Sequence, residues 1–175
     1  MVKTLLAAVV LLLMLVVPAM AQDDFPRLQM GFGYANVTLP PFISTSTSHN
    51  SGFTSQFNFN ILKSVGVDYY LGYYSLGNST ELLTNIFGGK LMYQGDKVVP
   101  YLVAGIGRGD FYISSGGYSQ GLGGGAASRL GGGIDYKIGD AFYWRTEITK
   151  MQFHATGSWI GKANIATGVV FTIMQ

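Results

Sequence analysis

The sequence predicts an all-β protein, namely an eight-stranded antiparallel up-and-down transmembrane β-barrel that follows a cleaved signal peptide. Three observations lead to this fold class. Eight stretches alternate apolar and polar residues with period two, which indicates strands. The connections between these stretches are alternately short and long, and the charged side chains gather on the face opposite the apolar one. The chain has 25 glycines and no cysteine, so a disulfide framework and a thiolate metal site are excluded.

The N-terminus carries the three parts of a secretory signal peptide. Lys3 precedes an apolar run over residues 5–17, and small residues then lead to a cleavage site after Ala21. The run is too short for a transmembrane helix, which needs about 20 apolar residues. The predicted domains are therefore a signal peptide over residues 1–21 and one β-barrel domain over residues 22–175. The net charge of +2 gives no basic patch, which argues against binding to nucleic acid.

The first four predicted strands alternate clearly. Their apolar faces carry Leu28, Met30, Phe32 and Tyr34 in the first strand, Phe53, Phe57, Phe59 and Ile61 in the second, Val67, Tyr69, Leu71 and Tyr73 in the third, and Leu83, Phe87, Leu91 and Tyr93 in the fourth. Polar or small residues stand between them. We therefore expect one face of each strand to point into the barrel and the other to point outward.

The last four predicted strands alternate less evenly. In the fifth, over residues 98–110, apolar residues occupy both parities, so its facing stays open. The outward faces of the other three carry Leu130, Ile134 and Tyr136 in the sixth strand, Phe142, Trp144, Thr146 and Ile148 in the seventh, and Ala163, Ile165, Thr167, Val169, Phe171 and Ile173 in the eighth.

The connections alternate in length along the chain. The short ones cover residues 62–64, 94–97 and 138–141, and the last two contain Gly-Asp pairs suited to tight hairpins. The long ones cover residues 37–52, 76–82, 112–126 and 153–161, and their Ser, Thr, Asn and Gly content predicts irregular loops. An up-and-down meander places all short turns at one end and all long loops at the other, as in membrane β-barrels.

Charge decides which face points outward. Only 11% of the residues are charged, which is low for the surface of a soluble protein. We therefore expect the polar faces to point inward, where six charged residues form a structural network in a plugged lumen: Asp68, Lys90, Arg129, Asp135, Arg145 and Glu147. An eight-stranded barrel is just wide enough for side chains to fill its interior.

Aromatic residues gather towards the predicted strand ends. Amphipathic rings prefer the interface between lipid headgroups and hydrocarbon, so we expect an aromatic girdle on the outer face. The predicted members are Tyr34, Tyr69, Tyr73, Tyr93, Tyr101, Phe111, Tyr136, Phe142, Trp144 and Phe171.

Three segments resemble a known family. They are residues 99–107, residues 131–136 with Arg145 and Glu147 following, and the terminal stretch from Asn164 to Phe171. Together they resemble the small outer-membrane β-barrel domain of OmpA/OmpX-type and porin-like proteins. The resemblance implies a monomeric barrel in a Gram-negative outer membrane, surrounded by outer-membrane lipid and matured by periplasmic chaperones and the barrel-assembly machinery. That family typically ends on an aromatic residue, whereas Ile173 occupies the corresponding place here.

The expected function is structural or interactive, with long extracellular loops that contact an unknown ligand and with no catalysis, cofactor or metal. The alternatives are a soluble periplasmic lipocalin-like binding barrel, a narrow small-solute pore and a lipid-modifying outer-membrane enzyme. An enzyme would need a base within reach of a nucleophile, and His154 with Thr156, Ser158 and Glu147 is the candidate set. The glycine-rich residues 121–126 lack the strand and helix of a dinucleotide site.

Overall fold

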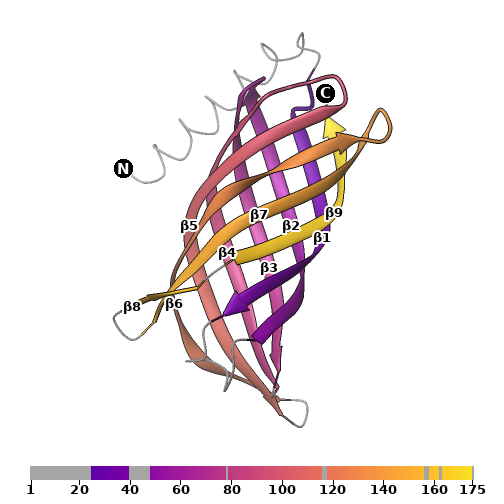
Figure 1. Ribbon diagram of the computed structural model, residues 1–175. Coiled ribbons are helices and arrows are strands. Elements are labelled where there is room, and N and C mark those ends of the chain that lie inside the picture. Colours follow the sequence, from indigo (N-terminus) through magenta and orange to yellow (C-terminus); the bar gives the residue numbers. More distant parts are fainter. Residues whose placement is uncertain are drawn as a thin grey trace, which may run out of the picture.

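Strands account for almost all of the chain that the structure describes. The computed structural model describes residues 25–39, 48–77, 79–115, 118–155, 158–161 and 163–174, and the predicted signal peptide lies outside these ranges. The strands are β1 (Leu28–Leu39), β2 (Ser48–Leu62), β3 (Val65–Gly77), β4 (Thr80–Met92), β5 (Val98–Ser115), β6 (Tyr118–Lys137), β7 (Phe142–Ala155), β8 (Ser158–Ile160) and β9 (Ala163–Met174). Figure 1 shows that the strands are tilted and wind around one common axis.

Antiparallel pairing of neighbours closes the sheet into a barrel. Each strand from β1 to β6 pairs with the next, β6 pairs with β7, β7 pairs with β9, and β9 returns to β1. The short β8 pairs with the C-terminal residues of β7, and β9 pairs with the rest of β7. Together, β8 and β9 therefore occupy the place of the eighth strand of the barrel. The predicted eight-stranded antiparallel barrel is therefore confirmed. Closure satisfies backbone hydrogen bonds along every strand, as a structure within lipid requires.

Within the described residues, no helix is long and apolar enough to cross a bilayer.

Large apolar side chains cover the outside of the barrel. Leu102, Ile106 and Leu130 are 64%, 77% and 64% exposed, while polar residues of the opposite parity, such as Asn58 and Thr84, are buried. Soluble proteins show the reverse arrangement. The outward faces predicted for seven of the strands are confirmed, and the soluble lipocalin-like alternative, which needs these apolar residues inside, is contradicted.

The structure also resolves the facing of β5. Val99, Tyr101 and Val103 are buried inside the barrel, whereas Leu102 and Ile106 point outward. Both parities are apolar because this strand contributes one row of apolar side chains to the lumen and another to the outer surface.

The predicted long loops are wrong over most of their length. Residues 112–126 belong instead to a hairpin of β5, which has 18 residues, and β6, which has 20, and only residues 116–117 separate the two strands. Similarly, β3 ends at Gly77 and β4 begins at Thr80. Ser, Thr and Gly favour loops on their own, but a ladder to a neighbouring strand holds them in extended conformation. Residues 40–47 lie outside the described part of the chain.

The interior is layered along the barrel axis. One apolar cluster, which includes Tyr74, Leu82 and Phe153, fills the end from which the long β5–β6 hairpin projects. A second, which includes Met92, Val99 and Val170, fills the end of the short turns. The six charged residues lie between the two clusters and come from β3, β4, β6 and β7. Figure 1 shows the hairpin at the end opposite the C-terminal arrow of β9.

Candidate functional site in the barrel lumen

Six charged side chains meet inside the barrel and are here called the lumenal charge cluster: Asp68, Lys90, Arg129, Asp135, Arg145 and Glu147. None is more than 5% exposed. The period-two alternation of each strand turns these residues inward, since their chain neighbours are the apolar residues of the outer face. Three positive and three negative charges balance one another, which buried ions require.

Arg145 and Lys90 share one carboxylate. Asp135 lies directly opposite Arg145 in the register of β6 and β7, and it accepts from the Arg145 Nε and Nη2 atoms at 2.6 Å each. The Lys90 ammonium is 3.3 Å from the Asp135 Oδ2 atom. The fork geometry of the guanidinium makes this a bidentate pair, the stronger kind of charge-assisted bond.

Arg129 bridges the other two carboxylates. Its Nη1 atom is 2.5 Å from the Asp68 Oδ2 atom, and its Nε atom donates to the Glu147 Oε1 atom at 3.3 Å. The Arg129 Nη2 atom also pairs with Glu147. One guanidinium thus joins β3 to β7 across the lumen.

Two amide side chains of β2 connect these halves. The Asn58 Oδ1 atom accepts from Lys90 at 2.9 Å and from Arg145 at 3.3 Å, while the Asn58 Nδ2 atom donates to Asp68 at 3.1 Å. Gln56 accepts from Arg145 and donates to Glu147 at 3.5 Å. An amide has both donors and acceptors, so these residues satisfy cations and anions at once.

Tyr101 lies inside the barrel, which corrects its predicted place in the outer girdle. Its hydroxyl donates to the Glu147 Oε2 atom at 3.0 Å, and its ring packs 4.2 Å beneath the Lys90 ammonium. The pattern of β5 contained a signal for this placement, because Tyr101 shares its parity with Gly105 and Gly109, and glycines of the other strands fall on the inward face. Strand parity also predicts that Gln56 and Asn58 lie on the inward polar face, but the predicted charge network does not include them.

A second polar chain extends from the cluster towards the apolar layer around Phe153. The Arg129 guanidinium lies 4.2 Å over the Tyr70 ring, and the Tyr70 and Tyr74 hydroxyls are hydrogen-bonded to each other. The Tyr74 hydroxyl donates to the Asn164 Oδ1 atom at 3.1 Å. The rings of Tyr70 and Tyr101 therefore pack against Arg129 and Lys90 on sides that no carboxylate contacts.

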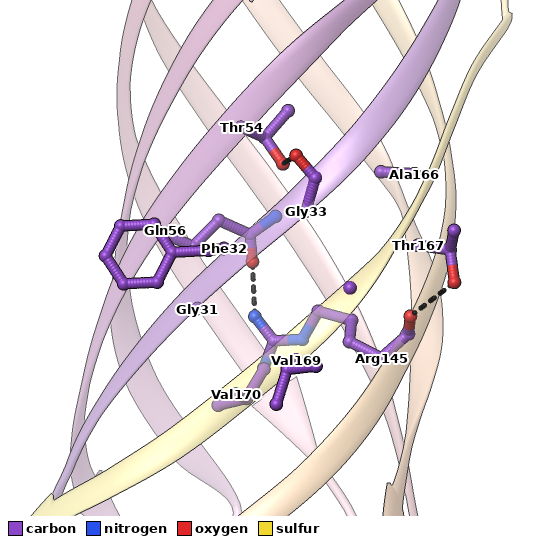
Figure 2. Close-up of a pocket in the computed structure, with 11 residues that line it drawn as sticks. Gly31, Phe32, Gly33, Thr54, Gln56, Arg145, Ala166, Thr167, Val169 and Val170 are labelled. Carbon is purple, nitrogen blue, oxygen red and sulfur yellow. Dashed lines mark hydrogen bonds between the residues drawn. The ribbon is translucent and has the colours of Figure 1, made fainter.

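Arg145 crosses beneath the seam between the first and last strands. Figure 2 shows its guanidinium pointing from β7 towards Gln56. The crevice at this place is lined by residues that include Gly31, Gly33 and Gly168. The crevice at this seam has a volume of about 10 Å³, which is about enough for one water molecule. A methyl group added at Gly33 would lie 2.7 Å from the Thr167 carbonyl oxygen, so these glycines bring the two strands close together.

The other predicted girdle residues divide by strand parity. Tyr34, Tyr69, Tyr73, Tyr93, Tyr136, Phe142, Trp144 and Phe171 lie on the outward face. Phe111 does not, which is a second correction, because its ring packs edge-on against Phe153 inside the barrel at 6.1 Å. The β5 register places Phe111 opposite Leu82, a buried residue of the lumen.

The predicted enzyme set is separated by the barrel wall. His154 is exposed on the outer face and stacks edge-on with Trp159 at 5.4 Å, whereas Glu147 is buried in the lumen. The side chains of Thr156 and Ser158, like that of His49, lie outside the described residues. Across the described ranges, no three His, Cys, Asp or Glu residues come together in a way that could hold a metal ion.

Several solved structures have a fold similar to that of this chain. Neisserial surface protein A superposes with a TM-score of 0.68 at 10% identity, over 83% of this chain and 96% of that one. The N-terminal β-barrel domain of Pseudomonas aeruginosa OprF gives 0.56 at 12% identity, over 83% and 98%. Ail, the attachment invasion locus protein of Yersinia pestis, gives 0.53 at 15% identity, over 82% and 97%. No curated protein sequence matches the chain.

A family model described as the outer membrane protein beta-barrel domain matches residues 7–172. This span is nearly the whole chain, and it agrees with the closed barrel and its apolar outer face. The protein therefore belongs to the outer membrane protein β-barrel domain family and resides in the bacterial outer membrane.

Proposed function

We propose that this protein is a non-catalytic barrel whose lumen is closed to solutes and whose extracellular hairpins contact partners at the cell surface. The observation that carries the closed lumen is the stack of three filled layers along the axis. Two apolar clusters lie on either side of the lumenal charge cluster, whose members are all at most 5% exposed. A solute crossing the barrel would have to break ion pairs in a dry environment, where they are strong.

Conductance across a planar lipid bilayer tests the closed lumen. The mature protein, refolded in detergent and shown to be folded by its gel mobility, should produce no discrete channel currents above those of protein-free detergent. A boiled sample of the same preparation controls for contaminating porins. Reproducible single-channel steps from the folded sample alone would contradict closure and favour the narrow-pore alternative.

The β5–β6 hairpin supports the contact role. A strand needs about 9–11 residues to cross the membrane, so roughly seven residues of β5, or about 20 Å, extend beyond it. In this class of barrel the longer extensions are extracellular and the periplasmic turns are short, which supports an extracellular position for this projecting hairpin. Near its tip, Ile113 and Leu122 are 37% and 56% exposed, and Leu122 lies at a bulge between the register pairs of Phe111 and Tyr112. Bulges commonly redirect a side chain.

Site-specific crosslinking tests this contact surface. A photoreactive amino acid placed at Leu122 or Ile113 in intact cells should give discrete crosslinked species that contain a second macromolecule. The same amino acid at Phe57, on the lipid-facing wall and 36% exposed, is the matched control. If the hairpin positions give no crosslinks beyond the Phe57 control, the contact role fails and only a structural role is left.

The placement of His154 supports the absence of catalysis. Its imidazole lies on the outer face, and the buried carboxylate of Glu147 is engaged with Arg129 and Tyr101. A general base needs a partner within hydrogen-bond reach. Purified protein in mixed micelles with phospholipid or with lipid A should therefore leave both substrates unchanged, and conversion that is lost in His154→Ala would overturn this part of the proposal.

A further inference from the structure

One lysine interrupts the apolar outer wall of the barrel. Lys150 lies on β7 with Leu130 opposite it on β6 and Ala163 opposite it on β9. It is exposed, as are Leu130, Ala163 and its same-face neighbour Ile148. The ion pairs among the described residues do not include Lys150, whereas Arg108 on the same wall pairs with Asp110 at 2.7 Å.

The outer face of β7 indicates the depth of Lys150 in the membrane. Moving outward from the short turn, it carries aromatic Phe142 and Trp144, then Thr146 and Ile148, then Lys150, and finally Gln152 and His154. Eight residues of strand, at the usual tilt, rise by about 20 Å. Because the apolar band is about 25 Å tall, the Cα atom of Lys150 lies near its outer edge. From there the flexible stem can extend the ammonium to the headgroup region.

A shallow, open groove adjoins Lys150. It is lined by Ile148, Thr149, Lys150, Gly161 and Ala163. The small side chain of Ala163, opposite Lys150, leaves the groove open. Gly161 has a φ of +138° and a backbone so close to β7 that a Cβ atom would overlap the Met151 carbonyl oxygen. A glycine is therefore required at this edge of the groove.

We propose that Lys150 and this groove bind a phosphate-bearing lipid of the outer leaflet. The groove is continuous with the lipid-facing wall, so an acyl chain fills it without leaving the hydrocarbon. The ammonium at its rim complements a phosphate group through a charge-assisted hydrogen bond. Farther out on the same face, Trp159 is 52% exposed beside His154, in the position where an indole contacts headgroups. A free phosphate ion would use the lysine but not the groove.

Native mass spectrometry of the full mature protein in detergent tests this site. The probes are lipid A, phosphatidic acid, zwitterionic phosphatidylcholine and inorganic phosphate. The wild-type protein should retain lipid A and phosphatidic acid in preference to phosphatidylcholine, and Lys150→Gln should bind the two anionic lipids about tenfold more weakly. Lys150→Arg, which keeps the charge, should restore most of the binding.

Matched variants separate the charge from the groove. Lys63→Gln removes an exposed lysine from the turn at the opposite end and should leave lipid binding unchanged. Ala163→Phe fills the groove and should weaken lipid binding without altering charge, while inorganic phosphate should not displace bound lipid. Equal binding by Lys150→Gln and the wild type would overturn the site. Displacement of bound lipid by phosphate would contradict the inference that the groove binds the acyl chain. Normal lipid binding by Ala163→Phe would contradict it as well. Gel mobility establishes that each variant is folded.

Discussion

At the scale of single residues, the middle layer of the barrel interior consists of ion pairs, whereas the layers on either side of it are apolar. Asp135 accepts from both Arg145 and Lys90, so each of its oxygens has a charged partner. Buried ion pairs of this kind add little net stability compared with apolar packing, because both ions lose their hydration. The effect of removing one partner is much larger, since it leaves an uncompensated charge in a dry site.

Arg145→Leu should therefore destabilise the folded barrel by about 3–5 kcal/mol. The variant leaves Asp135 with Lys90 alone and takes a donor from Gln56. Arg108→Leu is the matched control, because it breaks an exposed pair worth at most about 1 kcal/mol. Urea unfolding in detergent micelles, followed by the folded band on a gel, measures both. If Arg145→Leu unfolds at the same urea concentration as the wild type, the cluster does not stabilise the barrel through this residue.

Tyr101→Phe tests the inward placement of that ring. The variant keeps the ring beneath Lys90 but removes the hydroxyl that donates to Glu147, and the loss should be about 1.5–3 kcal/mol. Tyr93→Phe serves as the control, because its ring is 73% exposed at the short-turn end. Equal stability of the two variants in the same urea assay would argue that Tyr101 points outward.

At the scale of strands, the period-two alternation turns each side chain towards one of two environments, the lipid outside the barrel or the polar lumen. In β6, Arg129 and Asp135 face the lumen while Leu130 and Ile134 face lipid. A shift in register by one residue would place two charges in hydrocarbon and two apolar side chains among ions, so the pairing of every strand is strongly determined.

Ile134→Arg should reduce insertion into micelles or vesicles, because an arginine on the lipid face near midplane costs about 2–4 kcal/mol. Leu122→Arg places the same charge on the β5–β6 hairpin, which we propose to extend beyond the membrane and in which Leu122 is 56% exposed. This variant should insert like the wild type. The measurement is the fraction of folded protein after refolding into vesicles. Normal insertion of Ile134→Arg would show that residue 134 is not in contact with lipid.

The sequence allowed most of this strand pattern to be predicted, for a physical reason. Phe57 and Asn58, or Ile134 and Asp135, differ in polarity enough to fix their faces. The predicted outward placement of Tyr101 is wrong, because β5 is apolar on both parities and only its glycines indicate which face points inward. The partners within the lumenal charge cluster could not be predicted either, since the contact of Arg145 with Asp135 depends on a register that the turn between β6 and β7 establishes. The Ser- and Gly-rich residues 112–126 favour a loop by composition. In the structure, hydrogen bonds between β5 and β6 hold them as strands instead.

At the scale of the whole molecule, the protein has an apolar exterior and an interior in which a charged layer lies between two apolar clusters. Many of its large apolar side chains lie on the outside of the barrel, so folding in water would leave them exposed instead of burying them. Its polar layer is satisfied only when the strands have closed, and its backbone ladder is complete only in the barrel.

Folding of the mature chain should therefore depend on detergent micelles or vesicles. Refolded protein that is kept cold in SDS should migrate differently from boiled protein, and refolding in plain buffer should give only the boiled mobility. A monomeric species that folds in buffer alone would contradict the membrane orientation of the two faces.

The seam in Figure 2 also sets the order of events during folding. Tyr34 and Thr167 are register partners although roughly 130 residues separate them in the chain. Contacts of such high sequence separation form slowly, because the loop entropy must be lost before the contact is gained. The first strand therefore keeps an unpaired edge until the last one arrives, and anything that detains the C-terminal strand leaves a half-formed sheet open to pairing with another chain.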